Sequence, residues 1–210
     1  MGKSEINIVI SGVGGQGNVK AAQILGAAAI KAGYRVRISD VYGIAQRGGP
    51  VVSHIRIGEE IYGFLVEENK ADIVLGFEPM EALRAVAKFL RVGGLVIVNT
   101  RPIYPVEVNI GKAAYPNIGE ILSTISKVAG SVITLDATEV AKDSGIPIAS
   151  NIVMLGVLAG SGALPFEAEL LRDAIKENIP RFLEENLRAF EAGFSIGKTR
   201  VGYKERTMAQ

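Results

Sequence analysis

Short apolar runs and longer segments of helical character alternate along the chain. The short runs are rich in Ile, Val and Leu, and several are uninterrupted by a charged residue. Apolar runs of about five residues are typical of strands that are buried on both faces of a parallel sheet. We therefore predict strands at 6–10, 35–39, 73–77, 95–99 and 131–135.

The segments between these runs carry apolar residues at helical spacing, or many alanines. Gly33 is a natural C-terminal cap for the first of them, and Pro79 is tolerated in the first turn of another. Ser150 is a candidate N-cap. We predict helices at 19–32, 79–90, 118–128, 137–144 and 150–159, with two more inside 166–192 on either side of Pro180.

One region departs from this alternation. Residues 42–50 are rich in Gly and form a loop by composition. Residues 51–57 then alternate in part between apolar and polar side chains, and a Gly-Glu-Glu turn separates them from the short apolar run 61–64. This pattern predicts an antiparallel hairpin at an edge of the sheet.

Strands that alternate with helices indicate an α/β fold in which helices cover both faces of the sheet. We predict a doubly wound, mostly parallel, Rossmann-like three-layer domain with a small antiparallel hairpin insertion. No change in composition marks a linker, so we assign 1–198 to a single domain and 199–210 to a loose polar tail or partner-binding arm. In such sheets, ligands bind beyond the carboxyl ends of the strands.

Composition excludes several classes of function. The net charge of +1 provides no general attraction to nucleic acid or to an acidic membrane. The chain has no cysteine, so it contains no disulfide, no cysteine nucleophile and no thiolate-held zinc or iron–sulfur cluster. No apolar stretch approaches the roughly 20 residues that span a bilayer. Because the N-terminus is polar and shows no signal peptide, we expect a cytoplasmic protein that binds neither nucleic acid nor membrane.

The first predicted strand and helix flank a glycine-rich turn, Gly-Val-Gly-Gly-Gln-Gly at 12–17. Glycine permits a tight turn and close approach of a ligand to the backbone, and the first amides of the following helix suit an anion. The alternative is a tight turn between strand and helix that binds nothing. The candidate binding residues are Gly12, Gly14, Gly15, Gln16 and Gly17.

Asp40 and the loop after it are the second set of candidates. Asp40 follows Gly17 by 23 residues and ends the second predicted strand, where an acidic residue of a dinucleotide fold binds ribose hydroxyls. The alternative is an aspartate that caps a turn. Arg47 is a candidate for binding a phosphate or carboxylate, unless it is solvated on a flexible loop. The loop candidates are Gln46, Arg47, Gly48 and Gly49.

Other polar residues at the same edge are weaker candidates. His54 lies in an alternating strand and is more often a packed histidine than a catalytic base. Glu78 either caps the helix at 79–90 or faces a cleft. Asn99 ends a strand on this edge, and Asn151 lies beside the candidate cap Ser150. We find no nucleophile with a base and no carboxylate cluster, so we predict neither a catalytic residue nor a metal ligand.

Three stretches together resemble the gamma-type domain of 2-oxoacid:ferredoxin oxidoreductases. They are the glycine turn at 12–17, the Arg47-Gly48-Gly49 loop followed by a strand, and Phe77-Glu78-Pro79 with Glu81-Ala82. Asn99 and the segment 151–156 fit as well, so the resemblance covers 6–186. A free-standing chain of this length resembles the indolepyruvate branch of the family.

The resemblance implies an oxidative decarboxylation, in which a 2-oxo acid, coenzyme A and oxidised ferredoxin give acyl-coenzyme A, carbon dioxide and reduced ferredoxin. It implies that thiamine diphosphate and 4Fe–4S clusters belong to a larger alpha subunit, that the complex is a heterotetramer, and that this chain alone holds no cofactor. The glycine turn and the 47–49 loop would then form part of the site, with coenzyme A as a candidate ligand.

Two other functions fit parts of the pattern. The glycine turn and Asp40 suit an NAD(P)-dependent dehydrogenase, although no second domain is present to hold a substrate. The same glycine spacing occurs in ubiquitin-activating-type adenylyltransferases, but supporting motifs beyond Arg47 are missing. The sequence also departs from the family at 61–64, which reads Ile-Tyr-Gly-Phe where relatives often have a Ser-Pro pair. Partner contacts there are expected to differ.

Overall fold

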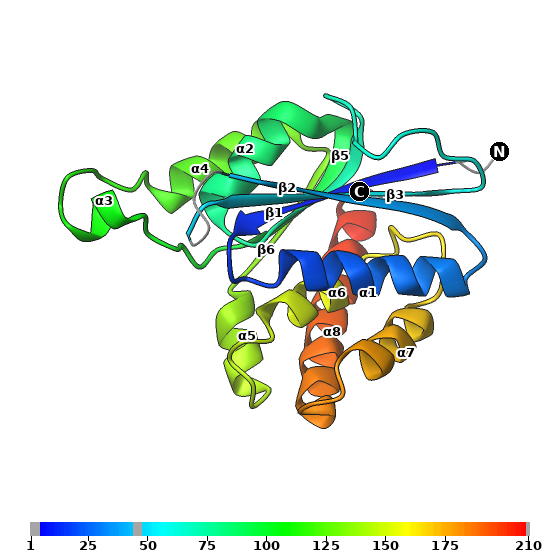
Figure 1. Ribbon diagram of the computed structural model, residues 1–210. Coiled ribbons are helices and arrows are strands. Elements are labelled where there is room, and N and C mark those ends of the chain that lie inside the picture. Colours follow the sequence, from blue (N-terminus) through cyan, green and yellow to red (C-terminus); the bar gives the residue numbers. More distant parts are fainter. Residues whose placement is uncertain (1–4, 44–47, 209–210) are drawn as a thin grey trace.

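A six-stranded mixed sheet forms the centre of the computed structural model, which describes the backbone of residues 5–43 and 48–208 and the side chains of 5–43 and 48–199 (Figure 1). The strand order is β2-β3-β1-β4-β5-β6. β1 pairs in parallel with β4, β4 with β5, and β5 with β6, whereas β3 is antiparallel to both β1 and β2. The strands are β1 (Glu5–Val13), β2 (Arg35–Tyr42), β3 (Pro50–Gly58), β4 (Ala71–Gly76), β5 (Leu90–Asn99) and β6 (Ser131–Leu135).

Helices cover both faces of the sheet. Helices α2 and α4 lie on one face, and α1, α5, α6, α7 and α8 lie on the other (Figure 1). The helices are α1 (Asn18–Lys31), α2 (Pro79–Phe89), α3 (Val106–Asn109), α4 (Ile118–Val128), α5 (Ala137–Asp143), α6 (Ser150–Gly160), α7 (Ala168–Asn178) and α8 (Leu183–Met208). The predicted three-layer α/β fold is therefore confirmed.

Aliphatic side chains build a separate core on each face. Ile8 and Ile10 of β1 point toward α1, while Val9 between them points toward α2, because successive strand residues face opposite sides. All three are fully buried. A strand covered on both sides needs apolar residues at successive positions, which explains why the continuous apolar runs were reliable guides to the sheet.

The predicted edge hairpin is wrong in its position. The antiparallel hairpin is formed by β2 and β3, and β3 lies inside the sheet between β2 and β1. The run 61–64 contains no strand. It belongs instead to a connection that crosses one face of β3, where the Val66 amide donates to His54 Nδ1 at 3.2 Å. The partial alternation of β3 arises because a loop, and not a helix, covers one of its faces.

Two further expectations about helix ends are wrong. Ser150 does not cap α6, whose N-cap position is Ala149 and has no side-chain hydrogen bond. The polar segment predicted as a loose tail is helical to Met208, because α8 continues across the boundary proposed at 198 and 199. The break near Pro180 is confirmed, since α7 ends at Asn178 and α8 begins at Leu183.

Helices α6 and α8 approach each other through glycines. A Cβ on Gly156 or Gly160 of α6 would overlap the backbone carbonyl of Phe190 or Phe194 on α8. Gly193 and Gly197 of α8 meet α6 in the same way. This contact holds α6 in place, and α6 begins directly beneath the glycine turn. In the part of the chain that the structure describes, no helix is long and apolar enough to cross a membrane.

Candidate functional site

The glycine turn lies where β1 ends and α1 begins, as the sequence predicts. Gly15 and Gly17 have φ values of +102° and +81°, in the left-handed region that favours glycine. Gly17 is the N-cap residue of α1, and the Ala21 amide donates to its carbonyl at 2.9 Å. The amides before Ala21 in the first turn of α1 therefore have no partner within the helix and point out of its positive end.

Gln16 stiffens this turn from within. Its Oε1 accepts from the Val13 amide at 2.7 Å, and its Nε2 donates to the Phe77 carbonyl at 2.7 Å. A Cβ on Gly12 would lie 2.7 Å from Gln16 Oε1 and 2.9 Å from the Asn18 amide group. Gly12 and Gln16 therefore form the packed back of the turn, although both were predicted to contact a ligand.

The loop between β2 and β3 lies against the glycine turn. The Gly14 amide donates to the Gly49 carbonyl at 2.9 Å, so the two predicted stretches meet in space. Gly48 has φ +73°, and an added Cβ there would have no atom within 4 Å. Gln46 and Arg47 lie outside the described residues.

A cleft of about 740 Å³ opens between the glycine turn, the first turn of α1 and the β2–β3 loop. Three of the predicted residues line it, namely Gly14, Gly15 and Gly17. The other predicted residues that the structure describes do not line it: Gly12, Gln16, Asp40, Gly48 and Gly49. A cleft of this volume suits a cofactor or a small-molecule substrate. Its lining residues are Val13, Gly14, Gly15, Gly17, Asn18, Val19, Lys20, Gln23, Tyr42, Gly43, Pro50 and Val51.

Asn18 and Lys20 give the cleft its polar character. Asn18 is buried and donates from Nδ2 to the Val51 carbonyl at 3.1 Å, while its buried Oδ1 has no hydrogen-bond partner among the described residues. Lys20 is exposed in the first turn of α1. The cleft therefore offers free helix amides and one cation, which suits an anionic ligand. Sequence reasoning missed both residues, although their place directly after the glycine motif was a usable signal.

Asp40 does not lie at the end of its strand. It lies two residues before the end of β2, and its carboxylate accepts a hydrogen bond from the hydroxyl of Ser53 at 2.5 Å. Ser53 is its cross-strand neighbour on β3. Because β3 pairs with β2 beyond the predicted end and lies between β2 and β1, Asp40 is neither at a strand end nor on a strand next to β1.

Glu78 caps α2 and does not face the cleft. Its Oε2 accepts from the Glu81 amide at 3.0 Å, and its Oε1 accepts from the hydroxyl of Tyr115. Burial, reinforced by this hydrogen bond to the carboxylate, raises the pKa of Tyr115 above its ordinary value. Burial also raises the pKa of Glu81 against the opposing effect of Arg84. These groups hold the chain together at the carboxyl edge of β4.

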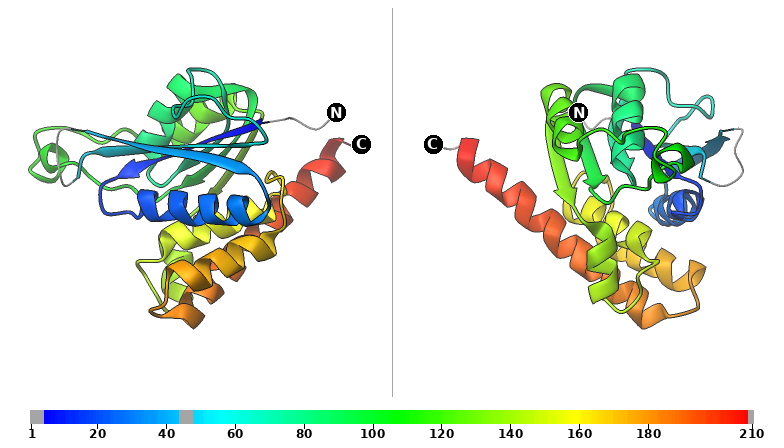
Figure 2. Two further views of the ribbon diagram at one scale, coloured as in Figure 1. Left: turned by 45° about the vertical axis from the view of Figure 1, so that its right-hand side comes forward. Right: turned by 90° about the vertical axis from the view of Figure 1, so that its left-hand side faces the viewer.

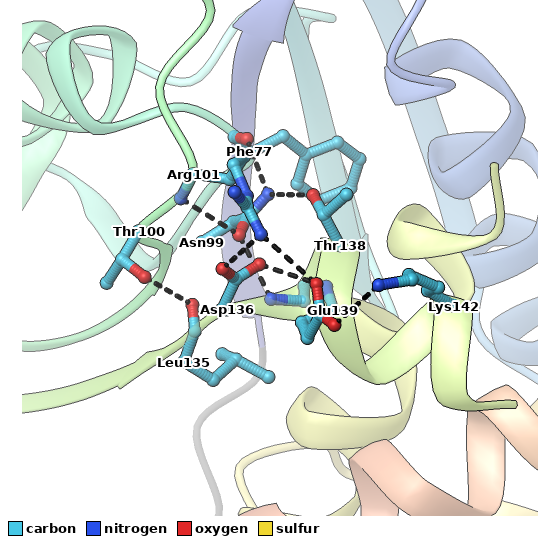
Figure 3. A network of polar contacts seen from close by, with 10 residues as sticks. Phe77, Asn99, Thr100, Arg101, Leu135, Asp136, Thr138, Glu139 and Lys142 are labelled. Atoms are coloured by element: carbon cyan, nitrogen blue, oxygen red, sulfur yellow. Dashed lines mark hydrogen bonds and ion pairs between the residues drawn. The ribbon is translucent and has the colours of Figure 1, made fainter. Parts of the chain in front are cut away.

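Asn99 joins β5 to its neighbours (Figure 3). Its Nδ2 donates to the Phe77 carbonyl at 3.2 Å, and its Oδ1 accepts from the amides of Ala137 at 3.0 Å and Arg101 at 3.2 Å. The Phe77 carbonyl thus accepts from both Gln16 and Asn99. This oxygen connects the glycine turn to the ends of β4 and β5, so Asn99 supports the site from behind.

Asn151 supports the turn from below. Its Nδ2 donates to the Gly17 carbonyl at 3.3 Å, and a Cβ on Gly17 would lie 2.5 Å from this nitrogen. Because Asn151 lies in the first turn of α6, the α6–α8 packing described above positions it.

His54 is a packed core residue, as the sequence favours. It is 3% exposed, and the ring of Phe89 meets it edge-on at 5.0 Å. Burial lowers the pKa of His54, and the Lys88 ammonium lowers it further, against a smaller opposing effect of Asp40. A neutral ring suits its Nδ1, which accepts from the Val66 amide.

The cleft has the chemistry of a binding site. Among the described residues that line it, Lys20 and Tyr42 are the only ionisable ones, so a nucleophile paired with a base is absent there. The part of the chain that the structure describes also contains no group of three or more His, Cys, Asp or Glu that could hold a metal ion. The arrangement can bind and orient an anionic molecule, and the described lining provides no catalytic machinery beyond that.

Known proteins are similar to this chain in sequence and fold. Residues 7–196 match the model of the family described as pyruvate ferredoxin/flavodoxin oxidoreductase. The indolepyruvate oxidoreductase subunit IorB of Thermococcus kodakarensis is 42% identical over 200 residues, which cover 94% of this chain and 98% of that protein. IorB of Pyrococcus horikoshii is 43% identical over 196 residues, or 92% and 96%. The gamma subunit of a keto/oxoacid ferredoxin oxidoreductase from Geobacter sulfurreducens, 25% identical, superposes with a TM-score of 0.68 over 92% of this chain and 99% of that one.

Proposed function

The chain belongs to the pyruvate ferredoxin/flavodoxin oxidoreductase family, and from that premise we propose that it is the small subunit of a thiamine diphosphate-dependent indolepyruvate:ferredoxin oxidoreductase. The complex oxidatively decarboxylates an aryl 2-oxo acid to its acyl-coenzyme A and passes the electrons to ferredoxin. The observation that carries the proposal is the match to indolepyruvate oxidoreductase subunits at 42% and 43% identity over nearly their whole length.

The redox chemistry belongs to a larger subunit. This chain has no cysteine, so it offers no thiolate to a 4Fe–4S cluster. Thiamine diphosphate, bound in the larger subunit, supplies the chemistry that cleaves the bond to the carboxylate. The small subunit contributes the edge of its sheet that carries the cleft, and copies of the small and larger subunits assemble into a cytoplasmic heterotetramer.

Coenzyme A is the ligand that best fits the cleft. It is a polyanion, and the first-turn amides of α1 and the Lys20 ammonium suit its phosphates. Gly15 leaves open space where a side chain would stand. Arg47, beside Gly48 and Gly49, is the second candidate cation.

Reconstitution tests the assignment. The chain is combined with the larger subunit from its own organism, and ferredoxin reduction is followed after indolepyruvate is added, with and without coenzyme A. We expect activity from the two chains together, dependent on coenzyme A, and none from this chain alone. Micromolar binding of NADH with turnover of a hydroxy acid by the isolated chain would reject the proposal in favour of a dehydrogenase.

A charge change tests the cleft itself. Lys20→Gln removes the cation at the start of α1, and Lys31→Gln removes one at the other end of the same helix, where it pairs with Glu177. We expect the first variant to raise KM for coenzyme A about tenfold, because charge-assisted contacts of this kind contribute about 1.5 kcal/mol. Lys31→Gln should leave this KM unchanged. If Lys20→Gln also keeps the wild-type KM, coenzyme A binds elsewhere.

A further inference from the structure

Residues 101–116, here called the arm, leave the carboxyl edge of the sheet between β5 and α4. The arm contains the short helix α3 and reaches out beyond the end of the sheet toward which β1 points (Figure 1). When that edge is turned toward the viewer, α3 lies in front of the sheet, on the side where α1 begins (Figure 2, right). The arm therefore projects from the same end of the sheet as the glycine turn.

Both ends of the arm are fixed to the domain. At its start, the Arg101 guanidinium pairs with Asp136 at 2.8 Å and Glu139 at 3.3 Å, both at the beginning of α5 (Figure 3). At its end, the hydroxyl of Tyr115 donates to Glu78, which is 2% exposed. A buried carboxylate that accepts a hydrogen bond holds its partner firmly, because leaving it unpaired is costly.

The middle of the arm is also ordered by its own contacts. The rings of Tyr104 and Tyr115 meet edge-on at 5.2 Å, and Asn109 Nδ2 donates to the Tyr104 carbonyl at 3.1 Å. The Lys112 amide donates to the Glu107 carbonyl at 2.8 Å. These contacts restrict the motion of the tip, and a restricted segment loses less entropy when it binds a partner.

The tip exposes apolar side chains. Val106 is 68% exposed and Ile110 is 56% exposed, and they lie one helical turn apart on the same side. Ile103 and Tyr104 add further exposed apolar surface next to them. A cluster of this kind on a fixed projection is typical of a protein–protein interface, where apolar and aromatic anchors fill pockets of the partner.

We infer that the tip of the arm inserts into an apolar pocket of the larger oxidoreductase subunit and fixes that subunit over the glycine cleft. The inference rests on the proposed function, because it takes the larger subunit to hold the reaction centre. A cleft without redox groups of its own contributes to that reaction only if the partner covers this edge, and the arm is the apolar projection beside it. A larger subunit is favoured over a second copy, since pairing two copies through their arms would leave each cleft without a reaction centre.

Paired charge substitutions test the surface. In Val106→Asp/Ile110→Asp the tip carries two carboxylates. In the control Val92→Asp/Val128→Asp the same change is made on exposed residues at the start of β5 and the end of α4, at the opposite end of the sheet. Each pair is co-expressed with the larger subunit, and the dissociation constant is measured on purified chains. We expect the arm pair to weaken the complex by at least about 100-fold and the control pair by less than about threefold.

The measurements separate the two proposals. The milder pair Val106→Ala/Ile110→Ala and the circular dichroism of each isolated variant show whether binding is lost without loss of folding. If both arm variants bind the larger subunit as tightly as the wild-type chain does, the arm inference is wrong and the proposed function is unaffected. If only the control pair loses binding, the interface lies around Val92 and Val128 and the arm inference is wrong. If the isolated chain forms a dimer that depends on the arm, the tip binds a second copy. Absence of any wild-type complex refutes the proposed function.

Discussion

Two groups of glycines perform different physical tasks in this domain. In the glycine turn, Gly15 and Gly17 adopt left-handed backbone angles, and a Cβ on Gly15 would meet no atom within 4 Å. At the contact of α6 with α8, Gly156 and Gly193 are ordinary helical residues whose missing Cβ lets two backbones touch. The first group provides backbone conformation, with open space at Gly15, whereas the second provides close packing.

The comparison predicts where added methyl groups will be tolerated. At the helix contact, an extra carbon must push backbones apart, and backbones do not rotate away as side chains do. At Gly15, an extra carbon finds space but must adopt an unfavourable φ, and at Gly17 it also overlaps the Asn151 side chain. Stability should therefore respond most at α6 and α8, while activity of the assembled enzyme should respond most at the turn.

The largest effect is expected for Gly193→Ala. The new Cβ would overlap the Val153 carbonyl of α6, so the two helices must separate or shift. We expect a loss of about 3 kcal/mol in the free energy of unfolding, measured by urea denaturation. Ser195→Ala, on the exposed side of the same helix, should change stability by less than about 0.5 kcal/mol. Similar values for the two variants would contradict the packing role.

Gly17→Ala should lose about 2 kcal/mol of stability, from strain at φ +81° together with overlap with the Asn151 side chain. This loss is smaller than at Gly193, because a side chain can move aside and a backbone cannot. The two contributions can be separated. Combining Gly17→Ala with Asn151→Ala removes the overlap and leaves the strain, so the double variant should be more stable than the sum of the single effects predicts. Strict additivity would mean that strain alone accounts for the loss.

Gly15→Ala isolates the conformational role. At φ +102° with no neighbouring atom, it should lose about 1 kcal/mol of stability. Its methyl group would enter the cleft, so we expect a clear rise in KM for coenzyme A in the reconstituted enzyme. Gly162→Ala, also at a left-handed φ with open space but away from the cleft, is the matched control. It should show the same stability loss with an unchanged KM.

Much of the fold is readable from local patterns. The helix at 118–128 and the strand at 131–135 match α4 and β6 at both ends, because each has strong apolar periodicity and a clear boundary. The glycine turn is readable too, since its special angles require glycine at fixed positions. These features depend on neighbours within a few residues.

The remaining features depend on partners distant in the chain. Asp40 was placed at a strand end, but pairing with β3 extends β2 past it. The order of the strands follows from the same pairing. The α6–α8 glycines are four residues apart within helices, where they resemble weak helix formers until the opposing backbone is known. The Tyr115–Glu78 contact joins residues 37 apart. Single-sequence periodicity carries no information of this kind.

The smallest effect is expected from pH, and it tests whether the two glycine groups act independently of the rest of the core. The lowered pKa of His54 means that the unfolded chain binds a proton more readily than the folded one below pH 6.5. Stability is therefore full above that pH and falls on acidification, by at most about 1.4 kcal/mol per pH unit from this residue. His54→Asn keeps an acceptor for the Val66 amide and does not titrate, so its unfolding free energy should change less between pH 7 and 5.5.

Because His54 lies on the face of the sheet opposite α6 and α8, the losses caused by Gly193→Ala and Gly15→Ala should remain constant across this range. A pH-dependent difference between those two variants would show that the glycine groups share a titrating partner, and the division between packing and conformation would then fail.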